Sequence, residues 1–157
     1  MKKRVKHFLT ILIIAIIVVY TLGFIGSIFI NEETGSDWYN EIKPSITPPN
    51  WVFPIVWNIL FFLIAVSITF VIINSKKEQR KYIIIFYGIN LFFNTLWSFL
   101  YFGMHNPFLA FLDLIIIWAS ILVLIIFNFG ISKKAAILLI PYLLWVSFAG
   151  IINYLSI

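Results

Sequence analysis

The stretch Pro107–Phe129, PFLAFLDLIIIWASILVLIIFNF, decides the fold class of this chain. It holds one ionisable side chain, Asp113, in a run that is otherwise almost entirely apolar. At a rise of about 1.5 Å per residue, a helix of this length crosses the roughly 30 Å hydrocarbon core of a bilayer. The pair Asn106-Pro107 directly before the run is a helix start signal. The stretch therefore predicts a transmembrane helix.

Four further runs of similar length and composition lie on both sides of it. The five predicted spans are residues 7–30, 51–74, 81–102, 107–129 and 135–154. The chain has 157 residues, 62% of them hydrophobic and 11% charged, whereas a soluble domain carries roughly 25% charged residues. We therefore expect a single membrane domain over residues 1–157, an all-α bundle of five transmembrane helices. The bilayer is then its surrounding medium.

The positions of the charges predict how the bundle is oriented. Basic residues cluster before the first span and in the second and fourth loops, whereas the first loop is acidic and the third is uncharged. The positive-inside rule then predicts a multi-pass protein of the cell membrane with a cytoplasmic N-terminus and an extracytoplasmic C-terminus and first loop. The same placement argues against nucleic acid as a partner, despite a formal net charge of +5. The apolar run after MKKRVK is too long for a signal-peptide core and has no small-residue cleavage site, so we expect a retained helix.

The first loop, residues 31–50, is the one long polar segment, and it contains most of the stretch WYNEIKPSITPPNWVFPIVW at Trp38–Trp57. Three tryptophans, one tyrosine and four prolines make this stretch stiff and aromatic. Such a segment at the entrance to a hydrophobic helix predicts a lid over a pocket. For Trp38 and Trp51, anchoring at the bilayer surface is an equally good interpretation.

Polar and aromatic side chains from four spans fall at one depth, in the half of the bilayer beneath this loop. Trp57 lies about six residues, or roughly 9 Å, inside the second span. Helical spacing relates two further sets, which are Asn90, Asn94, Trp97 and Ser98 on the third span and Pro141, Trp145, Ala149 and Asn153 on the fifth. Polar groups in hydrocarbon must be satisfied inside the protein, so both faces are expected to point into the bundle. They predict a cavity for a flat, largely apolar ligand with a few polar groups.

Asp113 is the strongest single signal in the interior, because no lysine or arginine lies well inside a span to pair with it. Two interpretations stay open: a protonated or amide-bonded carboxyl that joins helices, or a pocket wall that meets a polar group of the ligand. Asn90 and Asn94 have the same two interpretations. Trp118 is expected to pack between helices or to face lipid.

The sequence contains no set of residues that points to catalysis. It lacks a Ser-His-Asp set, a glycine-rich phosphate loop and a paired carboxylate within a span. His7 and His105 are too scattered for a metal site, and His105 is expected to be solvated. Gly23, Gly26 and Gly103 are candidates for close helix approach, although no G-x3-G spacing is present.

Several motifs resemble those of the TspO/MBR family, the tryptophan-rich sensory protein, translocator protein or peripheral benzodiazepine receptor family. They are WY-x3-KP-x3-PP-x-W-x6-W from Trp38, A-x-S from Ala65, N-x3-N-x2-WS from Asn90, A-x2-D from Ala110 and PYLLW-x-SFA-x3-N from Pro141. They follow the family's order and spacing from about Trp38 to Asn153, nearly the whole chain. The composition, rich in isoleucine, lysine and asparagine, suggests a bacterial member.

The resemblance implies a five-helix bundle, usually a homodimer, that binds porphyrins such as protoporphyrin IX and haem in a pocket covered by the first loop. Porphyrin is then a ligand, and no cofactor is required. The matching pocket positions are Tyr39, Pro48, Phe53, Trp57, Asn90, Asn94, Asp113, Trp145 and Ala149. Trp97, which shares the inward face of the third span, completes the predicted ligand-binding set.

Two positions depart from relatives. Ile46 stands where some members have an aromatic residue, so the wall is expected to be less aromatic there. Tyr154 is not followed by a basic residue, so the sterol-recognition pattern of the animal members is absent.

The leading functional hypothesis is a tetrapyrrole-binding sensor or transporter involved in porphyrin handling and the stress response. One alternative is an enzyme that degrades porphyrin with light and oxygen, in which the resemblance makes Trp57 and Trp145 the catalytic candidates. A second alternative is a structural or scaffold membrane protein.

Overall fold

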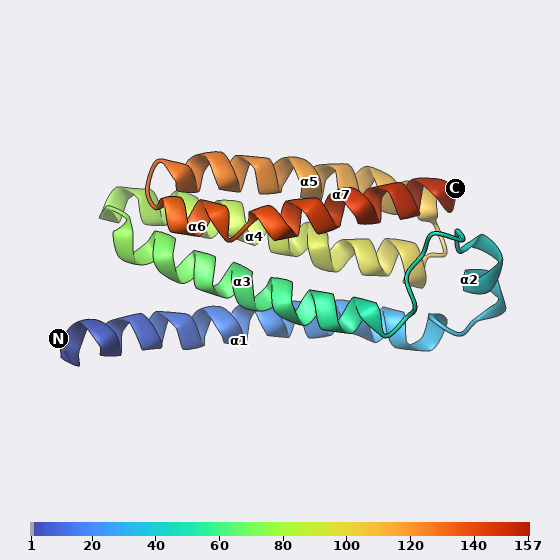
Figure 1. Ribbon diagram of the computed structural model, residues 1–157, viewed down its shortest axis with the longest axis horizontal. Coiled ribbons are helices and arrows are strands. Elements are labelled where there is room, and N and C mark those ends of the chain that lie inside the picture. The colour runs from blue at the N-terminus through green and yellow to red at the C-terminus, as the bar shows by residue number, and fades with distance from the viewer. Residues whose placement is uncertain (1) are drawn as a thin grey trace.

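A computed structural model describes residues 2–157, apart from the side chains of Lys2, Lys3, Asn31 and Glu32. The charges at Lys2, Lys3 and Glu32 that entered the orientation prediction therefore lie outside the described side chains. Five long helical segments lie side by side along the long axis of the molecule (Figure 1). They are α1 (Lys2–Glu33), α3 (Val52–Asn74), α4 (Arg80–Ser98), α5 (Pro107–Phe129) and the pair α6 (Lys133–Ile137) and α7 (Ile140–Leu155), which together form the fifth.

All five segments are long and apolar enough to cross a membrane. The predicted all-α fold with five transmembrane helices is therefore confirmed. Large apolar side chains cover the outer faces of the helices, for example Phe24 at 69%, Ile84 at 69% and Ile126 at 73% exposure. In water such exposure would be costly, but in a bilayer these faces meet lipid tails.

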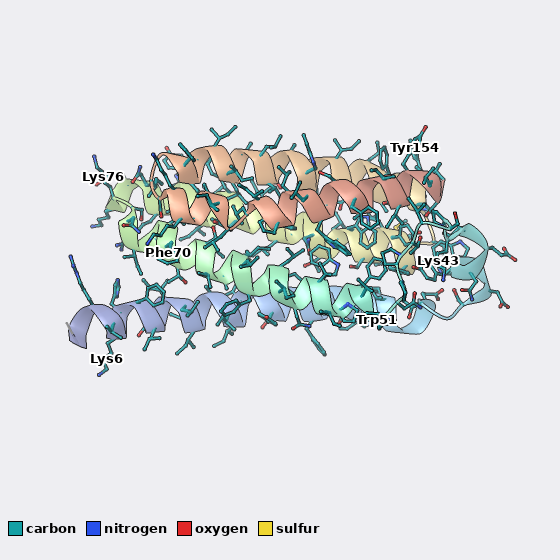
Figure 2. All side chains as sticks on the ribbon, in the orientation of Figure 1. Lys6, Lys43, Trp51, Phe70, Lys76 and Tyr154 are labelled. Carbon is teal, nitrogen blue, oxygen red and sulfur yellow. The ribbon has the colours of Figure 1, made fainter. Side chains whose placement is uncertain are left out.

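The two ends of the bundle differ in chemistry (Figure 2). Lys6 and Lys76 lie at one end, which we call the basic end. The short helix α2 (Asp37–Ile42) and the C-terminus lie at the other, which we call the α2 end. Ser36 caps α2, because its hydroxyl accepts a hydrogen bond from the Tyr39 amide at 3.1 Å. The lid segment thus contains a helical turn of its own.

The helix α5 has a central place in the packing, since it contacts α4, α6 and α7. Asn106 caps it by accepting from the Leu109 amide at 3.0 Å, and Pro107 occupies its first turn, as the sequence predicts. On the other side, α1 packs against α3 and α4. Most of the buried apolar side chains form one cluster along the bundle, and a smaller cluster of Tyr39, Tyr101, Phe102 and Ala110 lies at the α2 end.

Besides the short 3-10 turn η1 (Lys77–Gln79) before α4, two segments depart from regular α-helix, and neither was predicted. The helix α4 continues into a π-helical turn, η2 (Phe99–Gly103), in which the Met104 amide reaches back to the Phe99 carbonyl at 2.8 Å. The fifth span breaks at residues 138–139, between α6 and α7. Pro141 explains the break, because its ring excludes the carbonyl of Ile137 from a regular helix and it has no amide to donate.

A buried chain of hydrogen bonds accommodates this break. Ser67 on α3 donates to the Ala135 carbonyl at 2.7 Å, and Asn128 on α5 donates to the Tyr87 hydroxyl at 2.7 Å. Because Ser67 gives its single proton to Ala135, the Tyr87 hydroxyl is the donor in its own 2.7 Å contact with Ser67. A side chain of α3 thereby satisfies a carbonyl of α6, as a low-dielectric interior requires, and side chains of α4 and α5 extend the chain.

Close approach of α1 and α3 depends on Gly23. A Cβ at this position would overlap the Phe61 ring, whereas a Cβ at Gly88 on α4 would meet nothing within 4 Å. Gly26 is also confined, with Ser98 Oγ 3.2 Å from its Cβ position. Within the bundle, Gly23 and Gly26 thus permit close contact of α1 with α3 and α4.

We predict that Gly23→Ala lowers the free energy of unfolding by about 1–3 kcal/mol, because the added methyl group overpacks the α1–α3 contact. Gly88→Ala is the matched control and should not destabilise the protein. Thermal unfolding in detergent measures both variants. Adding Phe61→Leu to Gly23→Ala should restore part of the loss; equal stability of the two glycine variants would contradict the packing.

Candidate ligand-binding site

Tyr142 lies at the centre of the predicted site, although the sequence analysis did not single it out. It is fully buried on α7, and its hydroxyl accepts from Asn94 Nδ2 at 3.0 Å and donates to Asn90 Oδ1 at 3.2 Å. Asn90 Nδ2 in turn donates to Ser120 Oγ on α5 at 2.8 Å. One tyrosine and two asparagines thus connect α4, α5 and α7, so both amides act as helix-to-helix hydrogen-bond groups.

The inward face of α7 is rotated relative to the prediction. Tyr142, Val146 and Asn153 are buried, whereas Pro141 is exposed and Trp145 and Ala149 are half-buried. The prediction that Pro141 lies on the interior face is wrong. Its ring lies in the first turn of α7, directly after the break, where the missing amide of a proline costs little.

Trp97 and Asn153 form a second polar link above Tyr142. The Trp97 indole donates to Asn153 Oδ1 at 2.9 Å, and Asn153 Nδ2 donates to the Pro107 carbonyl at 2.8 Å. Trp97 also stacks on Tyr101, with ring centroids 5.1 Å apart. The face predicted for Trp97 therefore does point into the bundle, where its indole N–H is satisfied by protein.

Trp57, Phe53 and Trp145 form an aromatic wall between α3 and α7. Trp57 meets Tyr142 edge to face at 6.1 Å, and Phe53 meets Trp145 in the same way at 5.8 Å. Trp145 lines a groove of about 390 Å³ between α3 and α7, together with Val56, Ile59, Leu60, Pro141, Leu144 and Phe148. Asn90, Asn94 and Asp113 do not line this groove, so the predicted residues divide between a buried interior and a wall that faces the membrane.

Two buried polar groups in this region lack a hydrogen-bond partner within the described part of the chain. They are the Trp145 indole N–H and the carboxyl of Asp113, both of whose oxygens are buried without a donor. Asp113 is 4% exposed. The amide-bonded helix contact that the sequence left open for Asp113 is therefore not formed. Buried polar groups are nearly always paired, so these two are candidates for contact with a ligand.

The lid segment rests on η2. Tyr39 is buried, and its ring centroid lies 5.6 Å from that of Phe102 and 5.5 Å from Lys43 Nζ. Burial, with a smaller contribution from Tyr101, raises the pKa of Tyr39 to about 12, so its phenol is neutral at physiological pH. Pro48 is half-buried in the extended part of the same segment.

Trp38 and Trp51 have different surroundings. Trp51 is 66% exposed, in accord with a place at the bilayer surface. Trp38 packs against Tyr101 at 5.8 Å and stacks on His105 at 4.2 Å. His105 is 44% exposed, in accord with the expectation that it is solvated, and its imidazole also stacks on Trp38 and lies 3.0 Å from the Glu33 carboxylate.

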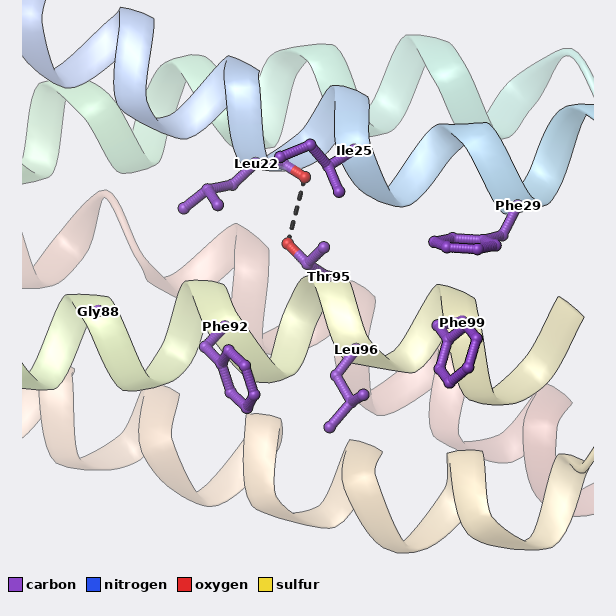
Figure 3. Close-up of a pocket in the computed structure, with 8 residues that line it drawn as sticks. All are labelled: Leu22, Ile25, Phe29, Gly88, Phe92, Thr95, Leu96 and Phe99. Carbon is purple, nitrogen blue, oxygen red and sulfur yellow. Dashed lines mark hydrogen bonds between the residues drawn. The ribbon is translucent and has the colours of Figure 1, made fainter. Parts of the chain in front are cut away.

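A second groove faces the membrane on the other side of the bundle (Figure 3). It has a volume of about 380 Å³ and is lined by α1 and α4, with Leu22, Phe92 and Phe99 among its walls. Thr95 closes its floor by donating to the Leu22 carbonyl at 3.1 Å. No unpartnered polar atom lines this groove among the described side chains, so it has the chemistry of a lipid-facing surface.

The fold and these contacts define a class: a multi-pass membrane protein of five helices whose interior at one end holds indoles, amides and one carboxyl beneath a short helical lid. Comparison with known proteins specifies the class further. The chain belongs to the TspO/MBR family, which it matches over residues 14–156.

Relatives from bacteria and animals align over most of their length. The sequence is 35% identical to the tryptophan-rich protein TspO of Chlorobaculum tepidum, over 85% of each chain. It is also 35% identical to the protein of that name from Bacillus cereus, over 92% of this chain and 91% of the relative. The identity to the human translocator protein is 30%, over 83% and 79% of the two chains. The family resemblance inferred from the motifs is therefore confirmed.

We predict that Tyr142→Phe lowers the free energy of unfolding by about 1–3 kcal/mol, because it leaves the amide of Asn94 and the carbonyl of Asn90 unpartnered in the interior. Tyr154→Phe, at a position that is 62% exposed on the same helix, should change it by less than about 0.5 kcal/mol. Chemical unfolding in mixed micelles compares the two. Indistinguishable midpoints would show that the Tyr142 hydroxyl is not a structural link.

Proposed function

We propose that this protein is a membrane receptor or transporter for a tetrapyrrole such as protoporphyrin IX or haem, bound beneath α2 between α3, α5 and α7. The observation that carries the proposal is that two buried polar groups lack a partner: the Trp145 indole N–H, on the aromatic wall, and the Asp113 carboxyl, which lies near Tyr142. A flat ligand supplies faces for the indoles and edge atoms for the polar groups. The resemblance to porphyrin-binding members of the family supports the same ligand class.

The charges at the α2 end indicate how such a ligand would be oriented. Ten of the eleven lysines and arginines fall before residue 7, between residues 76 and 81, or at residues 133 and 134, and the eleventh is Lys43. Lys43 is therefore the one cation of this kind near the lid, and its ammonium lies over the Tyr39 ring. The carboxylates of a porphyrin would pair with Lys43, and the apolar macrocycle would extend towards Trp57 and Trp145. Asp113, deeper in the bundle, would repel the carboxylates and accept from donor groups of the macrocycle.

The positive-inside rule supports an orientation in which the α2 end faces out of the cell. The ligand would then be taken up from, or released to, the outer half of the membrane. The groove at Trp145 lies between α3 and α7 and faces the lipid, which supports lateral access for a ligand dissolved in the bilayer.

The first test is a titration of protoporphyrin IX into the purified protein in the dark, followed by tryptophan fluorescence. Darkness avoids the light-dependent breakdown that some family members support. We expect saturable quenching, and a dissociation constant raised at least about tenfold in the double variant Trp57→Phe, Trp145→Phe, because two indoles are reduced to smaller phenyl rings and one hydrogen bond is lost. Trp51→Phe is the control and should bind as the wild type does. No saturable quenching, or equal affinity in the double variant, would contradict the site.

A second test addresses the role of Lys43. Lys43→Gln should weaken binding of protoporphyrin IX by about three- to tenfold, because one charge-assisted contact is lost. Binding of the dimethyl ester, which lacks both carboxylates, should be unchanged by the same substitution. An equal effect on the acid and the ester would show that Lys43 acts on the lid and not on the ligand's charges.

A further inference from the structure

The residue His105 lies in the turn between η2 and α5 and has a positive φ of 48°, the only such non-glycine residue among those described. Left-handed backbone is unfavourable for residues with a Cβ, and it persists where surrounding contacts compensate for it. The His105 side chain makes contacts that can offset this backbone cost.

The imidazole of His105 connects three segments that are distant in the sequence. Its Nε2 lies 3.0 Å from Glu33 Oε2 at the end of α1. Its ring stacks on Trp38 of α2, with centroids 4.2 Å apart and planes 17° from parallel. Glu33 Oε2 is buried and accepts no hydrogen bond from any described group, so its contact with the imidazole is one of ion-pair distance alone. His105 is thus a neighbour that the Glu33 carboxylate and the Trp38 indole share.

Few other charged groups surround this contact. On α2, Asp37 and Glu41 are exposed, and Lys43 after it lies over the Tyr39 ring. On η2, Tyr101 gives its proton to Ser156 Oγ at 3.0 Å. The first turn of α5 carries no acidic residue. The side chain of Glu32 lies outside the described part of the chain. Glu33 is therefore the one described carboxylate within ion-pair distance of the imidazole.

Histidine is the side chain that changes charge between about pH 5 and pH 8. A charged imidazole forms an ion pair with the Glu33 carboxylate and places a cation over the indole face of Trp38. A neutral imidazole loses the ion pair and the cation–π attraction, and retains only stacking. We propose that His105 is a pH-sensitive latch that holds α2 on η2 and the end of α1 in mild acid and loosens as the pH rises.

The direction of the effect follows from which states are charged. A charged imidazole attracts the Glu33 carboxylate and the indole face of Trp38, and a neutral one does not, so docking of α2 is tighter in mild acid than at pH 8. As the pH rises to 8 the contact weakens, and α2 exposes the ring of Tyr39 more often. The proposal goes beyond the tetrapyrrole function and does not depend on the identity of the ligand.

The absence of cysteine from the chain makes a direct test feasible. Ile42→Cys places a thiol on the half-buried side of α2, against the Tyr39–Phe102 cluster, and Asn40→Cys places one on its exposed side. The rate of maleimide labelling is measured for each from pH 5.5 to pH 8, without ligand. The ratio of the two rates cancels the pH dependence of thiol reactivity and reports how often α2 lifts. We expect the ratio to rise about three- to fivefold over this range, the size expected of one partly exposed ion pair.

Matched variants assign the effect to the latch. His105→Asn removes the titrating group while keeping a residue that tolerates left-handed backbone, and it should give a high ratio at every pH. Glu33→Gln should also flatten the profile, and His7→Asn, at the basic end, should leave it as in the wild type. A flat profile in the wild type, an unchanged profile in His105→Asn, or a loss of pH dependence in His7→Asn would each overturn the proposal.

Discussion

Every polar group that this bundle carries into the hydrocarbon must find its partner inside the protein, and the arrangement of the helices depends on that constraint. Two hydrogen-bonded levels meet most of this constraint, although Asn128 Oδ1 is buried without a described partner. Near the basic end, the chain Asn128–Tyr87–Ser67 leads to the carbonyl of Ala135. Near the α2 end, Tyr142 joins two asparagines of α4. Each level ties helices that sequence order alone would not bring together.

The same constraint separates structural groups from candidate ligand contacts. Asn90, Asn94, Trp97 and Asn153 look alike in the sequence as polar or indole groups inside spans, and all four are satisfied by protein partners. Asp113 and the Trp145 N–H have no such partner. Because leaving a buried polar group unpaired costs free energy, their persistence is the strongest physical argument for a bound ligand.

Much of the fold was predictable from the sequence, because a segment that spans a bilayer has to be a long, apolar helix. Hydropathy alone located all five spans, and Asn106-Pro107 marked the start of α5 correctly. The failures have local causes. The helical stripe drawn through Pro141 assumed an unbroken fifth helix, whereas the proline interrupts it and turns Tyr142 inwards. The π-helical turn at η2 has no sequence signature, and the position of His105 depends on it. Contacts of the lid with η2 could not be inferred, since they join segments that are more than sixty residues apart.

The central claim is that a flat ligand occupies the region between Trp57, Asp113 and Trp145 under α2. A structure of the protein with bound protoporphyrin IX tests this most directly. The account predicts the macrocycle against the indoles of Trp57 and Trp145, with a ligand atom within hydrogen-bond distance of Trp145 Nε1 or the Asp113 carboxyl. A macrocycle seated instead in the α1–α4 groove, with the indole and the carboxyl still unpartnered, would contradict it.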